Sequence, residues 1–365
     1  MSLRAGIVGL PNVGKSTLYN ALTHAGVAAA NYPFCTIDPN IGIVPVPDPR
    51  LDALAALVHP ERIIPATVEC VDIAGLVAGA SRGEGLGNQF LAHIRETDAI
   101  IEVVRCFESE TVVHVAGRID PLSDIAVIET ELALADLGTV ERAWARAQSQ
   151  AKSGNREAQE RAALFERIHK QLDGGGWVRQ LDFSVHERAE VRSLQLLTDK
   201  PVLYLANVGE DRTKPRIRAW METLEHHTRS QGAPLVAIST QIENELAELP
   251  PDERVAFLAE LGYDEPGLNR LIRAIYELLG LETYFTAGPK EVRAWTLPRG
   301  TTAPRAAGVI HSDFERGFIS AEVIAYEDFL SCGSESAARA AGKLRLEGRD
   351  YVVRDGDVVH FRFNV

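Results

Sequence analysis

Gly9–Ser16 reads GLPNVGKS and matches the pattern G-x-x-x-x-G-K-[ST] in full. It lies between a short apolar stretch, Arg4–Leu10, that predicts a buried strand, and a stretch, Lys15–Ala25, that predicts a helix. A glycine-rich turn between a strand and a helix binds phosphate, because its backbone N–H groups and the N-terminus of the helix point at the anion. The sequence therefore predicts an α/β domain that binds a nucleoside triphosphate.

Six consecutive residues of this motif are expected to contact the phosphates or their metal ion: Asn12, Val13, Gly14, Lys15, Ser16 and Thr17. Lys15 should reach the β- and γ-phosphates, and the Ser16 hydroxyl should ligate Mg²⁺. Asp72 ends a further expected strand, Ala66–Asp72, and is placed to hold Mg²⁺ through water. Thr36 lies in the loop between the two and is the best candidate to close on Mg²⁺ when a triphosphate is bound.

The segment after Asp72 bears on hydrolysis. It contains five glycines from Gly75 to Gly87, which lowers the cost of changing its backbone and fits a switch that responds to the γ-phosphate. Leu76 stands where Ras-type enzymes have a glutamine that orients the attacking water. Leucine cannot form that hydrogen bond, so another group must assist or hydrolysis is slow. His114 is one candidate, and the alternative is a surface histidine with no part in the chemistry.

Base recognition is expected at the end of a later strand. GTPases of this class read guanine with N-K-x-D, whose aspartate accepts hydrogen bonds from guanine N1–H and the 2-amino group. Here the corresponding residues are Asn207, Val208, Gly209 and Glu210, so the lysine is lost and the carboxylate side chain is longer. This change removes strict guanine selection and allows ATP, whose N6/N7 edge suits an asparagine. Ser239, which ends the next expected strand, should support the base through its backbone.

The spacing of the expected strands leaves room for an insertion. From Asp72 to Asn207 there are 135 residues, whereas two strand–helix repeats need about 60. The excess has helical spacing around a turn at Ser153–Asn155, and we expect a helical hairpin. Residues 141–172 have seven basic and four acidic side chains, a net charge of +3. A solvated helical surface is one interpretation, and a contact with RNA or an acidic partner is the other.

The C-terminal part, from about Thr283, has a different pattern. Alternation of polar and apolar residues and separating turns predict strands and one helix in a small β-rich domain. The expected strands are Glu291–Leu297, Gly317–Val323, Tyr351–Val353 and Val358–Phe363, and the expected helix is Ser334–Ala341.

The composition excludes several classes of protein. The 365 residues suggest two or three domains, and 45% apolar with 24% charged residues is the mix of a soluble globular chain. The net charge of −13 disfavours bulk attraction to nucleic acid, so any such contact must be local. The four cysteines are widely spaced, which argues against a zinc site or a disulfide framework. No stretch has the length of a membrane span or the features of a signal peptide, so we expect a cytoplasmic protein.

These motifs together resemble the YchF proteins, the Obg-like ATPases, over essentially the whole chain. The resemblance rests on Gly9–Thr17 (GLPNVGKST), Asn31–Asn40 (NYPFCTIDPN), Asp72–Asn88 (DIAGLVAGASRGEGLGN), Asn207–Glu210 (NVGE), Thr283–Trp295 (TYFTAGPKEVRAW) and Asp355–Val365. It implies a P-loop NTPase of the translation-factor class that hydrolyses ATP, disfavours GTP, binds the ribosome and is linked to translation and stress responses. His114 matches a histidine that is proposed to act in hydrolysis in this family. Asn12 matches an asparagine that helps to hold K⁺ in related potassium-stimulated NTPases.

The resemblance also implies three domains. These are a P-loop NTPase domain of the OBG type at residues 1–127 and 201–282, a helical coiled-coil insertion at 128–200 and a C-terminal TGS domain of β-grasp fold at 283–365. We therefore expect a monomeric cytoplasmic ATPase that uses His114 and Lys15 in hydrolysis and acts as a switch on the ribosome, with no membrane partner. A GTPase of the Obg type is the first alternative. A nucleotide-gated adaptor for RNA or ribosomes, with incidental hydrolysis, is the second.

Overall fold

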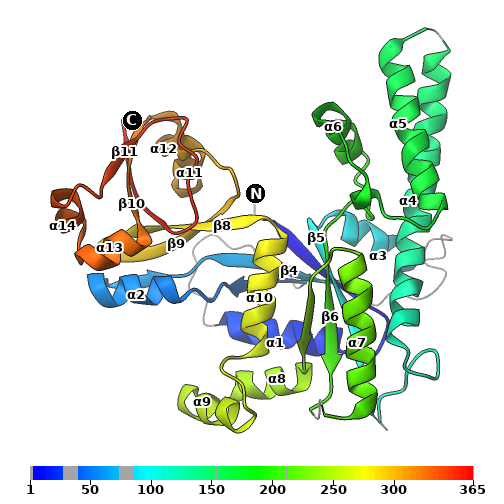
Figure 1. Cartoon of the computed structure of the whole chain (residues 1–365), viewed down its shortest axis with the longest axis horizontal. Helices are drawn as coiled ribbons and strands as arrows, with labels where there is room; N and C mark the ends of the chain where they lie inside the picture. The colour runs from blue at the N-terminus through cyan, green and yellow to red at the C-terminus, as the bar shows by residue number, and fades with distance from the viewer. Residues whose placement is uncertain are drawn as a thin grey trace. The chain divides into compact units, whose positions relative to one another are not determined.

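The computed structural model describes residues 3–27, 40–73, 86–109, 111–152, 154–210 and 213–364 (Figure 1). The chain divides into two compact units. Unit 1 consists of Met1–Gly42 and Glu69–Arg270, and unit 2 consists of Ile43–Val68 and Leu271–Val365. Among the described residues, every helix is too short or too polar to cross a membrane.

Unit 1 is built on a parallel sheet. Its neighbouring strands follow the order β4-β1-β5-β6-β7, and each of these pairs is parallel. The five strands are β1 (Arg4–Val8), β4 (Thr67–Asp72), β5 (Ala99–Cys106), β6 (Val202–Val208) and β7 (Leu235–Ile238), and the sixth strand of the sheet is β2 (Ile41–Pro45). Every residue of β5 and β6 is buried, as expected for central strands with helices on both faces. The strands expected at Arg4–Leu10 and Ala66–Asp72 are present as β1 and β4, and the predicted α/β class is confirmed.

The helices outside the hairpin in unit 1 begin after these strands or follow one another. They are α1 (Lys15–Val27), α3 (Leu86–Arg95), α7 (Pro215–Ser230), α8 (Thr240–Glu248), α9 (Pro251–Glu260) and α10 (Gly267–Leu278), which continues into unit 2. The side chain of Ser239 caps α8 by accepting a hydrogen bond from the backbone N–H of Ile242. Helix starts therefore gather beyond the carboxyl ends of the strands, where α/β sheets bind ligands.

The expected helical hairpin is present. Its long arm is α4 (Pro121–Ala151) and its short arm is α5 (Arg156–Asp173), and they lie side by side (Figure 1). They are followed by η2 (Val178–Gln180) and α6 (Val185–Ser193). The side chains of Asp120 and Asn155 cap the two arms. The hairpin has its own core, which includes Val140, Leu164, Phe165, Ile168 and Leu172. Helix α4 begins at Pro121, where Asp120–Pro121 forms a capped start.

Unit 2 contains a second, mixed sheet in the order β11-β10-β12-β8-β9-β3. Strand β12 is parallel to β8, and β8 with β9 and β10 with β12 are antiparallel. The strands are β3 (Arg62–Ile64), β8 (Leu281–Ala287), β9 (Glu291–Pro298), β10 (Phe318–Ala325), β11 (Arg345–Glu347) and β12 (Asp357–Phe363). The helices are α2 (Pro49–Val58), α11 (Ala303–Ile310), α12 (Ser312–Arg316), α13 (Tyr326–Cys332) and α14 (Glu335–Ala340). A hairpin beside a central parallel strand is the arrangement of a β-grasp sheet.

Two expectations for the C-terminal part are wrong. The described residues after 283 contain four helices rather than one, because α11, α12 and α13 have only five to eight residues and are too short to show a helical period. Tyr351–Val353 is not a strand: Val352 forms a single bridge with Thr302. The structure also groups Ile43–Val68 with the C-terminal residues, which no sequence pattern indicated.

Candidate nucleotide-binding site

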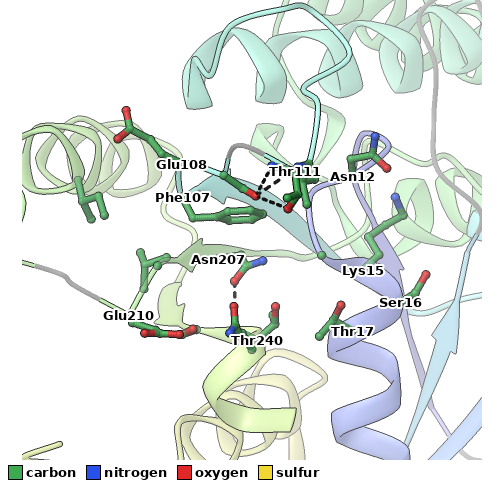
Figure 2. Close-up of a pocket in the computed structure, with 18 of the residues that line it drawn as sticks. Asn12, Lys15, Ser16, Thr17, Phe107, Glu108, Thr111, Asn207, Glu210 and Thr240 are labelled. Carbon is green, nitrogen blue, oxygen red and sulfur yellow. Dashed lines mark hydrogen bonds between the residues drawn. The ribbon is translucent and has the colours of Figure 1, made fainter. Parts of the chain in front are cut away.

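A cavity of about 680 Å³ lies in unit 1, beyond the carboxyl ends of β1, β5, β6 and β7 (Figure 2). It is lined by nine of the predicted site residues: Asn12, Gly14, Lys15, Ser16, Thr17, Asn207, Val208, Glu210 and Ser239. The volume is in the usual range for a cavity that binds a small ligand or cofactor. The predicted phosphate-binding and base-binding residues therefore surround one space.

The phosphate loop has the backbone that its glycines allow. Gly14 has a φ of 101°, and a Cβ there would lie 2.2 Å from Nδ2 of Asn207, so both its conformation and its surroundings require glycine. Asn12 has a φ of 63°, in the left-handed region that asparagine tolerates. Lys15 Nζ donates hydrogen bonds to the carbonyl oxygens of Gly9 at 3.0 Å and Leu10 at 2.8 Å. The loop thus holds its lysine folded back against its own carbonyls.

Lys15 is electrostatically poised for an anion. Its side chain is buried, and this burial lowers the pKa of Lys15 to about 8, although the nearby Asp72 carboxylate acts in the opposite direction. Burial also raises the pKa of Asp72, while Lys15 acts to lower it. A buried ammonium with one half-buried carboxylate nearby is strongly attracted to a polyphosphate, whose charge would restore the pKa of the lysine.

Asn207 has a different role from the expected contact with the adenine edge. Its Nδ2 donates to the carbonyl of Val13 at 2.8 Å, and its Oδ1 accepts from the backbone N–H of Thr240 at 3.1 Å. Both polar ends of the amide are therefore engaged, and the side chain is 3% exposed. Asn207 ties the phosphate loop to the start of α8 rather than presenting a free amide to a base. Val13 lies in the core and takes part through its carbonyl.

The base-binding end of the cavity combines apolar and charged groups. Val208 and Ile217 are buried, whereas Glu210 and Lys214 are exposed and also line the space. Lys214 was not predicted, because it lies four residues beyond the N-x-x-E segment. Ser239 lies at the cavity and caps α8 with its side chain, which leaves its backbone for other contacts.

The segment after β5 also borders the site, although no sequence motif indicated it. Phe107, Glu108, Ser109, Thr111 and Val112 line the cavity from this segment, and Thr240 and Gln241 line it from the start of α8. Figure 2 shows Phe107 and Thr111 across the cavity from Asn207 and Thr240. The buried Arg105 guanidinium donates to the carbonyls of Phe107 at 3.1 Å and Val112 at 2.9 Å. The rule that ligands bind at the carboxyl ends of strands, applied to Ala99–Cys106, was a signal that could have identified this segment.

His114 does not line the cavity. It is buried, and its Nε2 lies 2.9 Å from Oδ2 of Asp124 in the first turns of α4. Asn12 holds the neighbouring residue, because its Nδ2 donates to the carbonyl of Val113 at 3.1 Å.

Thr36 and Leu76 lie outside the described residues. No cluster of three metal-binding side chains of the His, Cys, Asp or Glu type occurs in the described part of the chain.

The comparisons with known proteins cover the whole chain. A family model described as 50S ribosome-binding GTPase matches residues 4–162, and the model YchF-GTPase_C, described as a protein of unknown function, matches residues 281–364. The "Ribosome-binding ATPase YchF" of Haemophilus influenzae is 60% identical over 100% of both chains, and the protein of the same name from Bacillus subtilis is 52% identical over 100% of both. The solved structure of the Schizosaccharomyces pombe YchF GTPase is 39% identical, with a TM-score of 0.88, and covers 99% of this chain and 98% of that one.

Proposed function

This chain belongs to the YchF family, and from that premise we propose that it binds and hydrolyses ATP in preference to GTP, as a nucleotide-dependent switch on the ribosome. The observation that carries the proposal is the buried Lys15 ammonium beside the phosphate loop, in a cavity at the carboxyl ends of four strands. The curated bacterial relatives are named ribosome-binding ATPases, which supports both the reaction and the partner.

In this proposal Lys15 and the backbone N–H groups of Asn12–Thr17 bind the phosphates. The Ser16 hydroxyl and the Asp72 carboxylate fit a divalent cation, because both offer the oxygen ligands that Mg²⁺ prefers, and Asp72 lies near enough to Lys15 to affect its pKa. Thr36 completes this metal set. Mg²⁺ would neutralise charge on the β- and γ-phosphates. The Asn12 carboxamide assists K⁺ binding through its oxygen, since its nitrogen donates to Val113.

The choice of ATP rests on the residues at the base. Val208 replaces the lysine of the guanine-reading motif. Glu210 is exposed, so its carboxylate is not held rigidly at the position that accepts from guanine N1–H. In this proposal Asn207 acts by joining the loops around the base, while Val208, Glu210 and the Ser239 backbone contact it. The fission yeast relative is named a GTPase, so an Obg-type GTPase is the alternative within this class.

Calorimetric titration with non-hydrolysable ATP and GTP analogues, in Mg²⁺ and K⁺, tests the nucleotide. We expect the ATP analogue to bind at least about tenfold more tightly, the ratio that 1.4 kcal/mol of base recognition produces. Lys15→Ala is the control and should weaken both analogues alike. Tighter binding of the GTP analogue would mean that Glu210 reads guanine, and the activity would then be that of a GTPase.

His114 is proposed to assist the attacking water. His114→Ala should lower kcat by roughly 10²-fold or more, the usual contribution of a positioned acid–base group, with little change in nucleotide affinity. Steady-state release of phosphate together with the calorimetric titration measures the two effects. Turnover equal to that of the unaltered chain would remove His114 from the mechanism.

A nucleotide-gated adaptor is the second candidate function, and the hairpin favours it. Arg146 and Lys152 are exposed and form no ion pair with any described residue, so they are available to RNA phosphates. Cosedimentation with ribosomes, using the unaltered chain and Lys15→Ala, separates the two functions. Binding that depends on ATP and is lost in Lys15→Ala supports a switch, whereas nucleotide-independent binding supports an adaptor.

The remaining expectations belong to the same proposal. We place the protein in the cytoplasm, because a ribosomal partner is found there. We also propose that it is a monomer. We also propose the domain boundaries 1–127 with 201–282 for the NTPase domain, 128–200 for the helical insertion and 283–365 for the TGS domain.

A further inference from the structure

His114 has no ring nitrogen available for a water molecule. The backbone N–H of Ala116 donates to Nδ1 at 3.1 Å, which makes Nδ1 an acceptor and leaves the proton on Nε2. Nε2 in turn donates to Oδ2 of Asp124 at 2.9 Å, and both side chains are more than nine-tenths buried. A histidine held in this way can neither orient an attacking water nor accept its proton.

The two residues on either side of His114 are valines, and both are exposed although apolar side chains favour burial. Val113 and Val115 expose 73% and 52% of their surface, whereas the imidazole between them is buried. Apolar side chains gain by leaving water, and an imidazole is readily solvated, so a rotation that begins after Val113 can cover Val115 while it moves the imidazole out of the interior. Gly117 follows with a φ of 71° and no atom near its Cβ position, which gives the chain a joint for such a rotation.

The segment is anchored so that a local rotation is sufficient. Arg105 binds the carbonyl of Val112, and Asn12 of the phosphate loop binds the carbonyl of Val113. His114 is therefore the first residue after the anchored part and is one residue from a contact with the loop that borders the cavity. Opening of its bond to Asp124 lets the ring move while Val112 and Val113 keep their anchors.

We propose that Asp124 is a positioning residue for hydrolysis: it holds His114 away from the nucleotide cavity, and the Asp124–His114 hydrogen bond must open before His114 can act. This inference rests on the proposed role of His114 in ATP hydrolysis. Asp124 belongs to α4, which continues without a break into the arm of the hairpin. A partner that binds the hairpin and displaces α4 would move Asp124 and release the histidine.

Turnover measurements on the full chain test the proposal. Asp124→Ala should raise kcat for ATP in the absence of ribosomes by about tenfold, the population change expected when one hydrogen bond to a charged group is lost, with KM unchanged. Asp124→Asn, which keeps the volume, should give a smaller rise. The double variant Asp124→Ala/His114→Ala should have the low turnover of His114→Ala. The matched control is Asp120→Asn. The Asp120 carboxylate caps the N-terminus of α4, four residues before Asp124, and does not touch His114.

A fall in kcat, or no change, in both Asp124 variants would overturn the proposal, because it would make Asp124 an orienter of the active histidine or a bystander. A kcat of the double variant Asp124→Ala/His114→Ala that is higher than that of His114→Ala would also overturn it. Hydrogen exchange supplies a readout that is independent of turnover: the Ala116 amide, bonded to Nδ1, should exchange faster in Asp124→Ala than in Asp120→Asn. If the unaltered chain does not hydrolyse ATP, the proposed function fails, whereas the exchange rates still decide whether Asp124 holds the histidine.

Discussion

At the scale of single residues, the side chains that shape the site act mostly on backbone. Asn207 joins the carbonyl of Val13 to the N–H of Thr240, and Arg105 joins the carbonyls of Phe107 and Val112. A planar amide or guanidinium that bridges two loops fixes their distance, because its donors and acceptors have set directions. The nucleotide cavity is thus preorganised by residues that need not touch the nucleotide.

Asn207→Ala should weaken binding of the ATP analogue by roughly tenfold or more, since it leaves a buried carbonyl and a buried N–H without partners and frees the phosphate loop. Calorimetric titration measures the effect. Gln241→Ala is the control, because Gln241 also lines the cavity but its amide is tied to Glu245 in the same helix. Equal affinities in the two variants would show that the bridge does not matter for binding.

Glu102 carries a prediction about pH. It lies in β5, is 1% exposed, and burial raises its pKa well above the usual value, with Glu129 acting in the same direction. The folded state therefore retains the Glu102 proton at pH values where the unfolded chain has lost it. The free energy of unfolding should consequently fall as pH rises above about 4.5, through the raised pKa.

Glu102→Gln, which resembles the protonated carboxyl, should remove this part of the pH dependence. We expect the variant to be more stable than the unaltered chain by about 1 kcal/mol or more at pH 8, and to differ less at pH 5. Urea denaturation at the two pH values measures this. Glu157→Gln, an exposed change on the hairpin, should leave the curves unaltered. A variant that loses the same stability between pH 5 and pH 8 as the unaltered chain would contradict the assignment.

At the scale of elements, α4 is the helix that connects the sheet unit with the hairpin. Asp136 anchors its middle: the carboxylate is fully buried and accepts from the backbone N–H groups of Leu197 at 3.0 Å and Thr198 at 2.7 Å, and from the Thr198 hydroxyl. The N-terminal end of α4 holds His114 through Asp124, and its other end forms the hairpin with α5. A displacement of α4 would therefore move both Asp124 at its N-terminal end and the hairpin at its other end.

Asp136→Ala should destabilise unit 1 by about 3 kcal/mol, because three buried donors lose their acceptor at once. Asp136→Asn should cost less, since it keeps one acceptor oxygen. Thermal denaturation of the full chain measures both, with Asp173→Ala at the exposed end of α5 as the control. A loss in Asp136→Ala no larger than that of the control would mean that the turn at 197–198 does not depend on this carboxylate.

At the scale of the whole molecule, the chain leaves unit 1 and returns to it before it completes either unit. Ile43–Val68 supplies α2 and β3 to unit 2, and β3 pairs with β9. Arg50, in this early stretch, forms ion pairs with Asp48 at 2.8 Å and Asp355 at 2.6 Å, and its guanidinium lies 5.3 Å from the ring centroid of Phe285. Residues from both ends of the chain therefore build unit 2.

Arg50→Ala should lower the stability of unit 2 by about 1 kcal/mol, a modest value because the Asp355 partner is half exposed. Hydrogen exchange of the β8 and β12 amides reports on this unit separately from unit 1. Arg62→Ala is the matched control, since its ion pair with Glu291 is 3.9 Å long and its side chain is exposed. Protection in β8 and β12 that is the same in both variants would contradict a stabilising role for Arg50.

Features that depend on neighbouring residues along the chain could be predicted before folding. The phosphate loop is contiguous, so the identities of Gly14, Lys15 and Ser16 state its chemistry, and the central strands of unit 1 are apolar runs that can only be buried. The helical hairpin followed from the spacing of its apolar residues. Features that join distant residues appeared only on folding: the bridge of Asn207, the hydrogen bond from Asn12 to Val113 and the inclusion of Ile43–Val68 in unit 2. Hydrogen bonds and burial between segments far apart in the chain leave no periodic trace in either segment, and their geometry exists only once both are packed.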